Sequence, residues 1–176
     1  MEKKSRYFII TDTHFFHKKI VDYCYRPENF DELIKKGLTM ISENDIIIHI
    51  GDICMGHDQE VHDNIIKPLK CLRKILVRGN HDNKSILWYQ NNGWDIACNG
   101  LSLNYAGRRV YFSHKPIKPT SNFDLNIHGH FHNAPRERWE EDCSEYYNFD
   151  FHRLLILENN NYQPILLDKL MKAPMM

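Results

Sequence analysis

The chain has 176 residues, with 23 basic and 23 acidic side chains and a formal net charge of zero at pH 7. This length suits one domain, predicted over residues 1–176, whose core is large enough to need no disulfide or metal staple. The charge balance argues against a broad electrostatic grip on nucleic acid or an anionic membrane, although a local positive site stays open.

The sequence predicts a cytoplasmic location and no membrane association. Residues 1–6 are charged and lack a signal-peptide layout, and no apolar run approaches transmembrane length. The five cysteines are odd in number, widely spaced and free of any C-x-x-C pair. We therefore expect reduced thiols and neither a disulfide framework nor a zinc ribbon.

The first half of the chain alternates strands and helices. Short apolar runs predict strands at 6–11, 45–50 and 74–77, and the unbroken run at 45–50 suggests that both of its faces are covered. Helices are predicted at 18–25, 31–42, 59–69 and 85–91.

The second half favours short strands and tight turns. A hairpin is predicted from 101–105 and 109–113, followed by a strand at 125–127. Residues 153–157 and 164–167 are expected to form a last strand pair. The combination predicts a mixed α/β domain with its chemical groups at the carboxyl ends of strands.

Histidine is the unusual feature of the composition. There are 11, and six of them lie where an apolar run ends, namely His14, His81, His114, His128, His130 and His132.

Polar motifs follow the predicted strands in a fixed order. They are Asp12-Thr13-His14, Gly51-Asp52, Gly79-Asn80-His81-Asp82, the single His114, and Gly129-His130-Phe131-His132. In an extended segment, residues two apart such as Asp12 and His14 point the same way. Each motif alone has a simpler explanation, as a turn or as a polar strand end meeting solvent.

Taken together, the motifs resemble the calcineurin-like metallophosphoesterase family. The stretch DTHFFHKKIVDYCYRP and the tail YQPILLDKL resemble a small, uncapped bacterial and phage-type branch. The resemblance implies a single-domain four-layer α-β-β-α sandwich, with two mixed sheets flanked by helices. Without a cap, the site should be open and suit small phosphodiesters or nucleotide-like substrates.

The resemblance also implies two metal sites that share one carboxylate. One ion would be held by Asp12, His14, Asp52 and His132. The other would be held by Asp52, Asn80, His114 and His130. His81 would face the phosphate, steadying the transition state or protonating the leaving oxygen, and Asp82 would orient it.

Elementary chemistry agrees with this implication. Two ions roughly 3.5–4 Å apart can clamp the attacking and leaving oxygens of an in-line displacement, with a bridging hydroxide as nucleophile. Mixed imidazole and oxygen ligands suit divalent Mn, Fe, Zn, Co or Ni.

Three further residues have weaker claims. His17 and Arg26 are read either as contacts to the substrate phosphate or as surface helix residues. His128 is interpreted either as a residue that acts directly in the site or, with more support, as a residue that holds the metal ligands in place.

Three functions are compared. The leading one is a phosphoesterase that hydrolyses phosphodiester or phosphomonoester bonds. A small nuclease would need a basic or aromatic track, for which the candidates are Arg108, Arg109, Lys115, Arg136, Arg138 and Trp139. A catalytically silent interaction scaffold is disfavoured because the full set of motif residues is retained.

Overall fold

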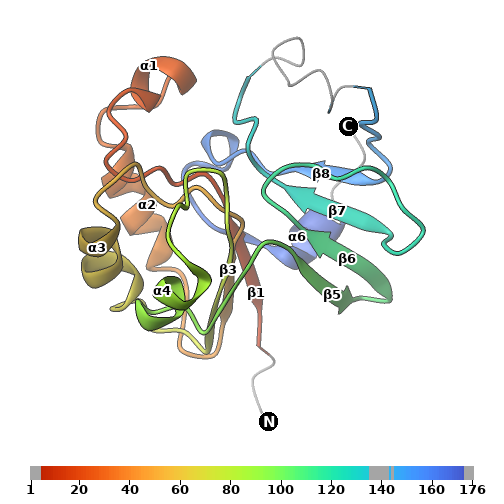
Figure 1. The fold of residues 1–176 in the computed structure, drawn as a ribbon, viewed down its shortest axis with the longest axis horizontal. Helices are drawn as coiled ribbons and strands as arrows, with labels where there is room; N and C mark the ends of the chain where they lie inside the picture. Colours follow the sequence, from red (N-terminus) through yellow and green to blue (C-terminus); the bar gives the residue numbers. More distant parts are fainter. Residues whose placement is uncertain (1–4, 135–142, 144, 173–176) are drawn as a thin grey trace.

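The computed structural model describes residues 5–134, 143 and 145–172, which form two sheets packed against each other (Figure 1). The strands of the first sheet are β1 (Tyr7–Ile10), β2 (Ile46–His49), β3 (Arg73–Val77), β4 (Ile96–Cys98) and β9 (Ile165–Leu166). Their order is β4-β3-β2-β1-β9. The first four run parallel, and β9 is antiparallel to β1.

The second sheet is built from the later part of the chain. Its strands, in spatial order, are β5 (Leu101–Tyr105), β6 (Arg108–Phe112), β7 (Leu125–His128) and β8 (His152–Leu154). β5 and β6 form the predicted antiparallel hairpin, while β6, β7 and β8 are parallel. Both sheets are therefore mixed.

Helices flank the sheets. They are α1 (Ile20–Cys24), α2 (Phe30–Leu38), α3 (Asp58–Val61), the π-helix η1 (His62–Ile66), α4 (Ile86–Asn91), the 3-10 helix η3 (Glu158–Asn160) and α6 (Leu167–Lys172). Figure 1 shows α2, α3 and α4 on the side of the first sheet that faces away from the second. The predicted architecture of two mixed sheets flanked by helices is confirmed.

The first sheet lies between two hydrophobic cores. Ile9, Ile48 and Ile75 are aligned side by side and pack toward the second sheet, beside Phe112 and Ile127. Their sequence neighbours, such as Phe8, Ile47 and Leu76, pack toward the helices. Because alternate residues of a strand face opposite sides, burial of both faces explains the unbroken apolar run in β2.

The predicted last strand pair is wrong. β8 pairs with β7 in the second sheet, whereas β9 pairs with β1 in the first. Between them the chain forms η3 and then takes a left-handed backbone at Asn161 and Tyr162, with φ of 51° and 58°. This segment carries the chain from one sheet to the other and does not fold as a hairpin.

Three other elements differ from expectation. β4 and α6 were not predicted, and the helix expected at 59–69 divides into α3 and η1. In η1 the amide of Lys67 donates to the carbonyl of His62 over 2.8 Å, five residues back. The imidazole of His62 accepts from the Trp94 indole over 3.0 Å, which anchors this irregular turn in the core. Within the described ranges, no helix is both long and apolar enough to cross a bilayer.

A buried carboxylate fixes the start of the first sheet. Asp45 accepts two hydrogen bonds from the Arg6 guanidinium, at 2.8 and 2.7 Å, and two more from Ser42. The Arg6 hydrogen bonds hold the pKa of Asp45 well below its ordinary value, and those from Ser42 add to the effect.

We expect Asp45→Asn to lower the free energy of unfolding by about 1–2 kcal/mol at pH 7, since hydrogen bonds to a charged group are lost. A carboxylate with a lowered pKa in the folded state stabilises the fold at pH values above its unfolded pKa, which is near 4. That contribution to stability is lost as the pH falls toward the folded-state pKa. The difference in Tm between variant and wild type should therefore shrink below about pH 4. Circular dichroism melts at pH 7 and pH 3 test this, and an equal difference at both would contradict it.

Candidate metal centre

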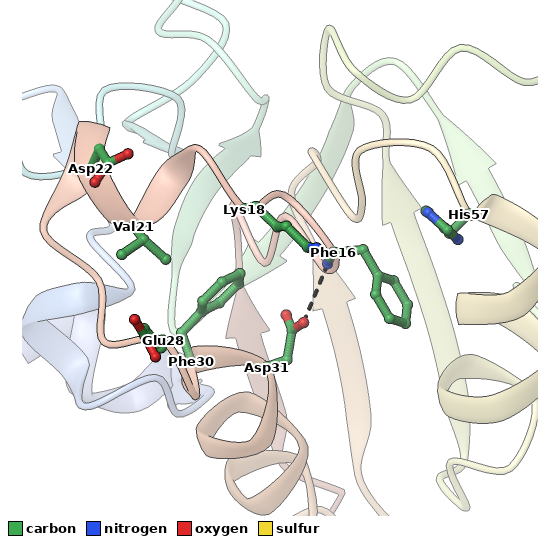
Figure 2. A pocket seen from close by; sticks show the side chains of 8 residues that line it. All are labelled: Phe16, Lys18, Val21, Asp22, Glu28, Phe30, Asp31 and His57. Carbon is green, nitrogen blue, oxygen red and sulfur yellow. Dashed lines mark hydrogen bonds between the residues drawn. The ribbon is translucent and has the colours of Figure 1, made fainter.

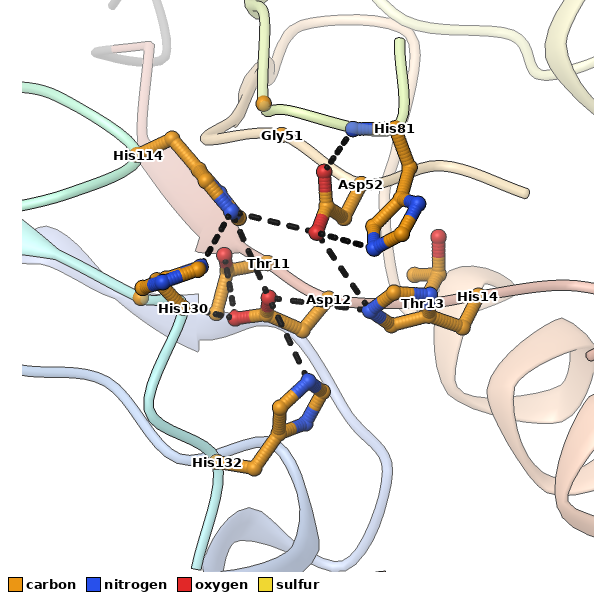
Figure 3. Close-up of polar contacts among 12 residues, drawn as sticks. Thr11, Asp12, Thr13, His14, Gly51, Asp52, His81, His114, His130 and His132 are labelled. Carbon is orange, nitrogen blue, oxygen red and sulfur yellow. Dashed lines mark hydrogen bonds and ion pairs between the residues drawn. The ribbon is translucent and has the colours of Figure 1, made fainter. Parts of the chain in front are cut away.

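Side chains from five strand ends meet at one place, where the carboxyl edges of the two sheets come together (Figure 3). They are Asp12 and His14 after β1, Asp52 after β2, His81 after β3, His114 after β6, and His130 and His132 after β7. Backbone hydrogen bonds join the loops, as from the His14 amide to the Asp52 carbonyl over 3.0 Å and from Gly129 to His114 over 3.1 Å.

Strained, left-handed backbone carries most of these side chains. Five of the seven predicted ligands have left-handed backbone, with φ of 51° at Asp12, 47° at His14, 59° at Asp52, 75° at His130 and 49° at His132. Each such residue costs on the order of 1 kcal/mol, and backbone strain of this kind is typical of functional sites. The premise that Asp12 and His14 align because their segment is extended is therefore wrong, since both residues have left-handed backbone.

Asp12 presents one free oxygen to three imidazoles. Its Oδ2 accepts hydrogen bonds from the Thr11 hydroxyl at 2.8 Å and the His130 amide at 3.0 Å. Its Oδ1 is buried and has no hydrogen-bond partner among the described residues. The Nε2 atoms of His132, His14 and His114 lie 3.7, 3.9 and 4.0 Å from that oxygen.

Asp52 lies between the two halves of the cluster. Its Oδ1 accepts from the His81 amide at 2.9 Å. Its Oδ2 is 3.1 Å from Nε2 of His114 and 3.5 Å from Nε2 of His14. One carboxylate oxygen therefore faces imidazoles on both sides.

The donors divide into two groups of metal-binding geometry, and in each group the ligand atoms lie within 4.8 Å of one another. One group is Asp12, His14 and His132, and the other is Asp52, His114 and His130. Both ring nitrogens of His14 are buried without a hydrogen-bond partner in the described part of the chain. Because orphaned buried polar atoms are costly, a bound cation would satisfy atoms that otherwise have nothing to bind.

The electrostatics also call for positive charge. Burial alone would lower the pKa of His114, but Asp52 and Asp12 outweigh it and raise the pKa to about 9. Burial is likewise outweighed at His132, where Asp12 and Glu158 help to raise the pKa to about 10. Burial lowers the pKa of His14 to about 2, which leaves this ring neutral and able to donate a lone pair.

The residues of the third motif, Gly79-Asn80-His81-Asp82, lie in different surroundings. The ring of His81 is 37% exposed, with Nε2 3.9 Å from Oδ2 of Asp52. Asn80 precedes His81 in the same loop and is exposed, and its role as a ligand stays a prediction.

Among the described residues, the hydrogen bonds of Asp82 go to backbone amides, whereas the imidazole of His81 was its expected partner. Its carboxylate accepts from the backbone amides of Gly79 at 2.8 Å, Asp52 at 2.9 Å and Ile53 at 3.1 Å. It therefore fastens the loop that carries Asp52 to the loop that carries His81.

The three residues with weaker claims fall in different surroundings. The ring of His17 lies 5.3 Å from that of His14 and 6.5 Å from that of His81, beside the cluster. Arg26 is buried and is not the surface residue that one reading expected. His128 is fully buried, and its Nε2 lies 2.9 Å from the Tyr147 hydroxyl. It therefore packs beneath the last motif and does not face the cluster as a ligand.

Glu158 is a residue of the site that sequence reasoning missed. Its Oε1 accepts from the Arg26 guanidinium at 2.8 Å and lies 3.3 Å from Nδ1 of His132. It sits in an asparagine-rich segment with no motif around it, and no sequence signal could have connected it to the cluster.

Comparison with known proteins identifies the family. A model of calcineurin-like phosphoesterases matches residues 5–167. The chain belongs to the calcineurin-like phosphoesterase family. An uncharacterized protein of Methanocaldococcus jannaschii is 29% identical to this phosphoesterase over 175 residues, which cover 94% of this chain and 89% of that protein. A protein of unknown function from Aquifex aeolicus matches in structure with a TM-score of 0.75 and 26% identity, covering 96% of this chain and 99% of that one.

The phosphoesterase has a cavity of about 660 Å³ beyond the loop that follows His14 (Figure 2). Phe16 and Lys18, on either side of His17, line it together with Phe30, Asp31, Val21, Asp22, Glu28 and His57. The Phe16 ring is 37% exposed and packs on the His57 ring with centroids 5.0 Å apart. The cavity therefore combines an aromatic wall with a mostly acidic rim.

Proposed function

We propose that this phosphoesterase hydrolyses small phosphodiesters at a binuclear metal site. The observation that carries the proposal is the pair of donor groups that meet at Asp52, together with the orphaned Oδ1 of Asp12. Two bound divalent ions would supply an activated water as nucleophile and would stabilise charge on the phosphate oxygens. The chain would hold one ion with Asp12, His14, Asp52 and His132, and the other with Asp52, His114, His130 and, as the family resemblance implies, Asn80.

His81 is the proposed contact to the phosphate. Its side chain is about one-third exposed at the edge of the cluster, beside Asp52 and the ring of His14. An imidazole at this place can donate a hydrogen bond to a phosphate oxygen or pass a proton to the leaving oxygen. Asp82 acts on it indirectly, by fixing the loop.

A cavity of small-molecule size lies beside His17, but its lining includes three carboxylates and none of the predicted metal ligands. Its volume lies within the range of small-molecule sites. A nuclease is less well supported. Arg109 is paired with Asp124 at 2.7 Å, and Arg108 donates to the Asp124 carbonyl at 2.9 Å. Arg136, Arg138 and Trp139 lie outside the described residues.

The test is hydrolysis by protein stripped with a chelator and then reloaded separately with Mn, Co, Ni, Zn or Mg. We expect stripped protein to be inactive and reloaded protein to bind two ions and to cleave bis(p-nitrophenyl) phosphate faster than p-nitrophenyl phosphate. The panel adds cyclic nucleotides, dinucleoside polyphosphates and oligonucleotides at low salt. Preferred cleavage of oligonucleotides would favour the nuclease, and a protein that binds no metal and stays inert with manganese would favour the scaffold.

A further inference from the structure

A buried ion pair lies directly behind the metal centre. Nε of Arg26 donates to Oε1 of Glu158 at 2.8 Å, and the two side chains are 0% and 8% exposed. The same guanidinium donates to the backbone carbonyls of Asp12 at 2.7 Å and Thr13 at 3.0 Å. The pair thus connects the first motif to η3, and Arg26 and Glu158 are 132 residues apart in the sequence.

The carboxylate of this pair also faces a metal-binding histidine. Nδ1 of His132 lies 3.3 Å from Oε1 of Glu158 and 3.4 Å from Nη2 of Arg26. A guanidinium only donates hydrogen bonds, so of these two groups the carboxylate is the one that can accept a proton from Nδ1. With its proton on Nδ1, the ring has its lone pair on Nε2, which points toward Oδ1 of Asp12.

A second proposed ligand, His114, also has an oxygen acceptor beside its Nδ1. Nδ1 of His114 lies 2.9 Å from the carbonyl oxygen of Ile50, and its Nε2 faces Asp52. Histidines that bind metals commonly donate their second ring N–H to a carbonyl or carboxylate, which fixes the ring and its tautomer. At His132 the acceptor is a side chain and can therefore be changed by mutation.

We propose that Glu158 is a positioning residue of the metal centre, and that Arg26 holds it in place. Glu158 fixes His132 in the tautomer that presents Nε2 to the ion bound with Asp12 and His14. The proposal rests on the proposed function, because it assigns Glu158 to one of the two metal sites. It predicts a selective effect on that site.

The same place is a poor third cation site. The Cys24 thiol lies within 4.8 Å of the ligand atoms of His132 and Glu158, which gives a possible ligand triad. However, the Arg26 guanidinium already neutralises the carboxylate at 2.8 Å and would repel a dication. The charge at this place therefore serves to orient His132.

The test is Glu158→Gln, which keeps the volume of the side chain and removes its charge. A glutamine can turn its NH2 toward Nδ1 and so favour the opposite tautomer. Titration with Mn²⁺ by calorimetry should show one of the two sites weakened by about tenfold to a hundredfold and the other unchanged. The visible spectrum of the Co²⁺-loaded variant should change in the contribution of that site alone. Glu32→Gln, on an exposed i,i+3 pair with Lys35, is the matched control and should bind as wild type.

Two comparisons keep the outcome clear. If Glu158→Gln does not fold, Arg26→Gln with Glu158→Gln removes both buried charges and should show the same selective loss. Wild-type protein that binds no metal would overturn the proposed function itself. Wild-type protein that binds two ions, with either variant binding both equally well, would overturn the role of Glu158 alone, as would an equal loss at both sites.

Discussion

Asp52→Asn is expected to slow hydrolysis of bis(p-nitrophenyl) phosphate by about a thousandfold or more, equivalent to about 4 kcal/mol in the barrier. Oδ2 of Asp52 faces His114 at 3.1 Å and His14 at 3.5 Å, so it is the oxygen best placed to bind both proposed ions. Two dications a few ångströms apart repel strongly, and a neutral amide would not screen that repulsion.

The fold should survive this change. The asparagine has the same volume, and its Oδ1 can still accept from the His81 amide, as the carboxylate does at 2.9 Å. Bound metal, measured by elemental analysis, should fall below two ions per chain, while circular dichroism and Tm stay close to those of wild type. Asp63→Asn, on an exposed pair with Lys67, is the control for loss of a carboxylate. Full turnover in Asp52→Asn would contradict the binuclear site.

The parts of the fold that could be predicted are those with a strong local signal. β1, β2 and β3 are apolar runs buried on both faces, and the sequence shows them directly. β4 has three residues, of which only Ala97 is buried, so its apolar signal is too short to distinguish from a loop. The predicted pairing of β8 with β9 is wrong because strand pairing depends on how the whole chain packs. The local sequence pattern shows that a segment is a strand but does not show which strand it pairs with.

The site divides in the same way. Its loops carry their reactive residues in short motifs, so Asp12, His14, Asp52, His114, His130 and His132 could be chosen from the sequence as candidate ligands. The residues that hold these ligands have no such signature. Glu158 reaches His132 only through the fold, and Asp82 binds backbone amides of two loops, which depends on their relative position.

Gly79→Ala is expected to reduce turnover by about a hundredfold or more, although it changes no candidate ligand. A Cβ at this position would lie 2.6 Å from the backbone nitrogen of Asp52 and collide with the Asp52 carboxylate. The neighbouring loop cannot retreat easily, because Oδ2 of Asp82 accepts hydrogen bonds from the amides of both Gly79 and Asp52, at 2.8 and 2.9 Å. Misplacement of a catalytic group by about 1 Å is enough for a loss of this size.

A comparison of Gly79→Ala with Asp52→Asn separates the effect of the position of Asp52 from the effect of its charge. Gly79→Ala keeps every carboxylate and imidazole, so a high concentration of Mn²⁺ should restore part of its activity, whereas Asp52→Asn lacks the charge and should stay inactive. Gly107→Ala is the matched control, since its Cβ would meet nothing within 4 Å while its φ of +78° costs about 1 kcal/mol of strain. It should lower Tm and leave kcat unchanged. If Gly79→Ala is as active as Gly107→Ala, the close approach of the two loops does not position Asp52.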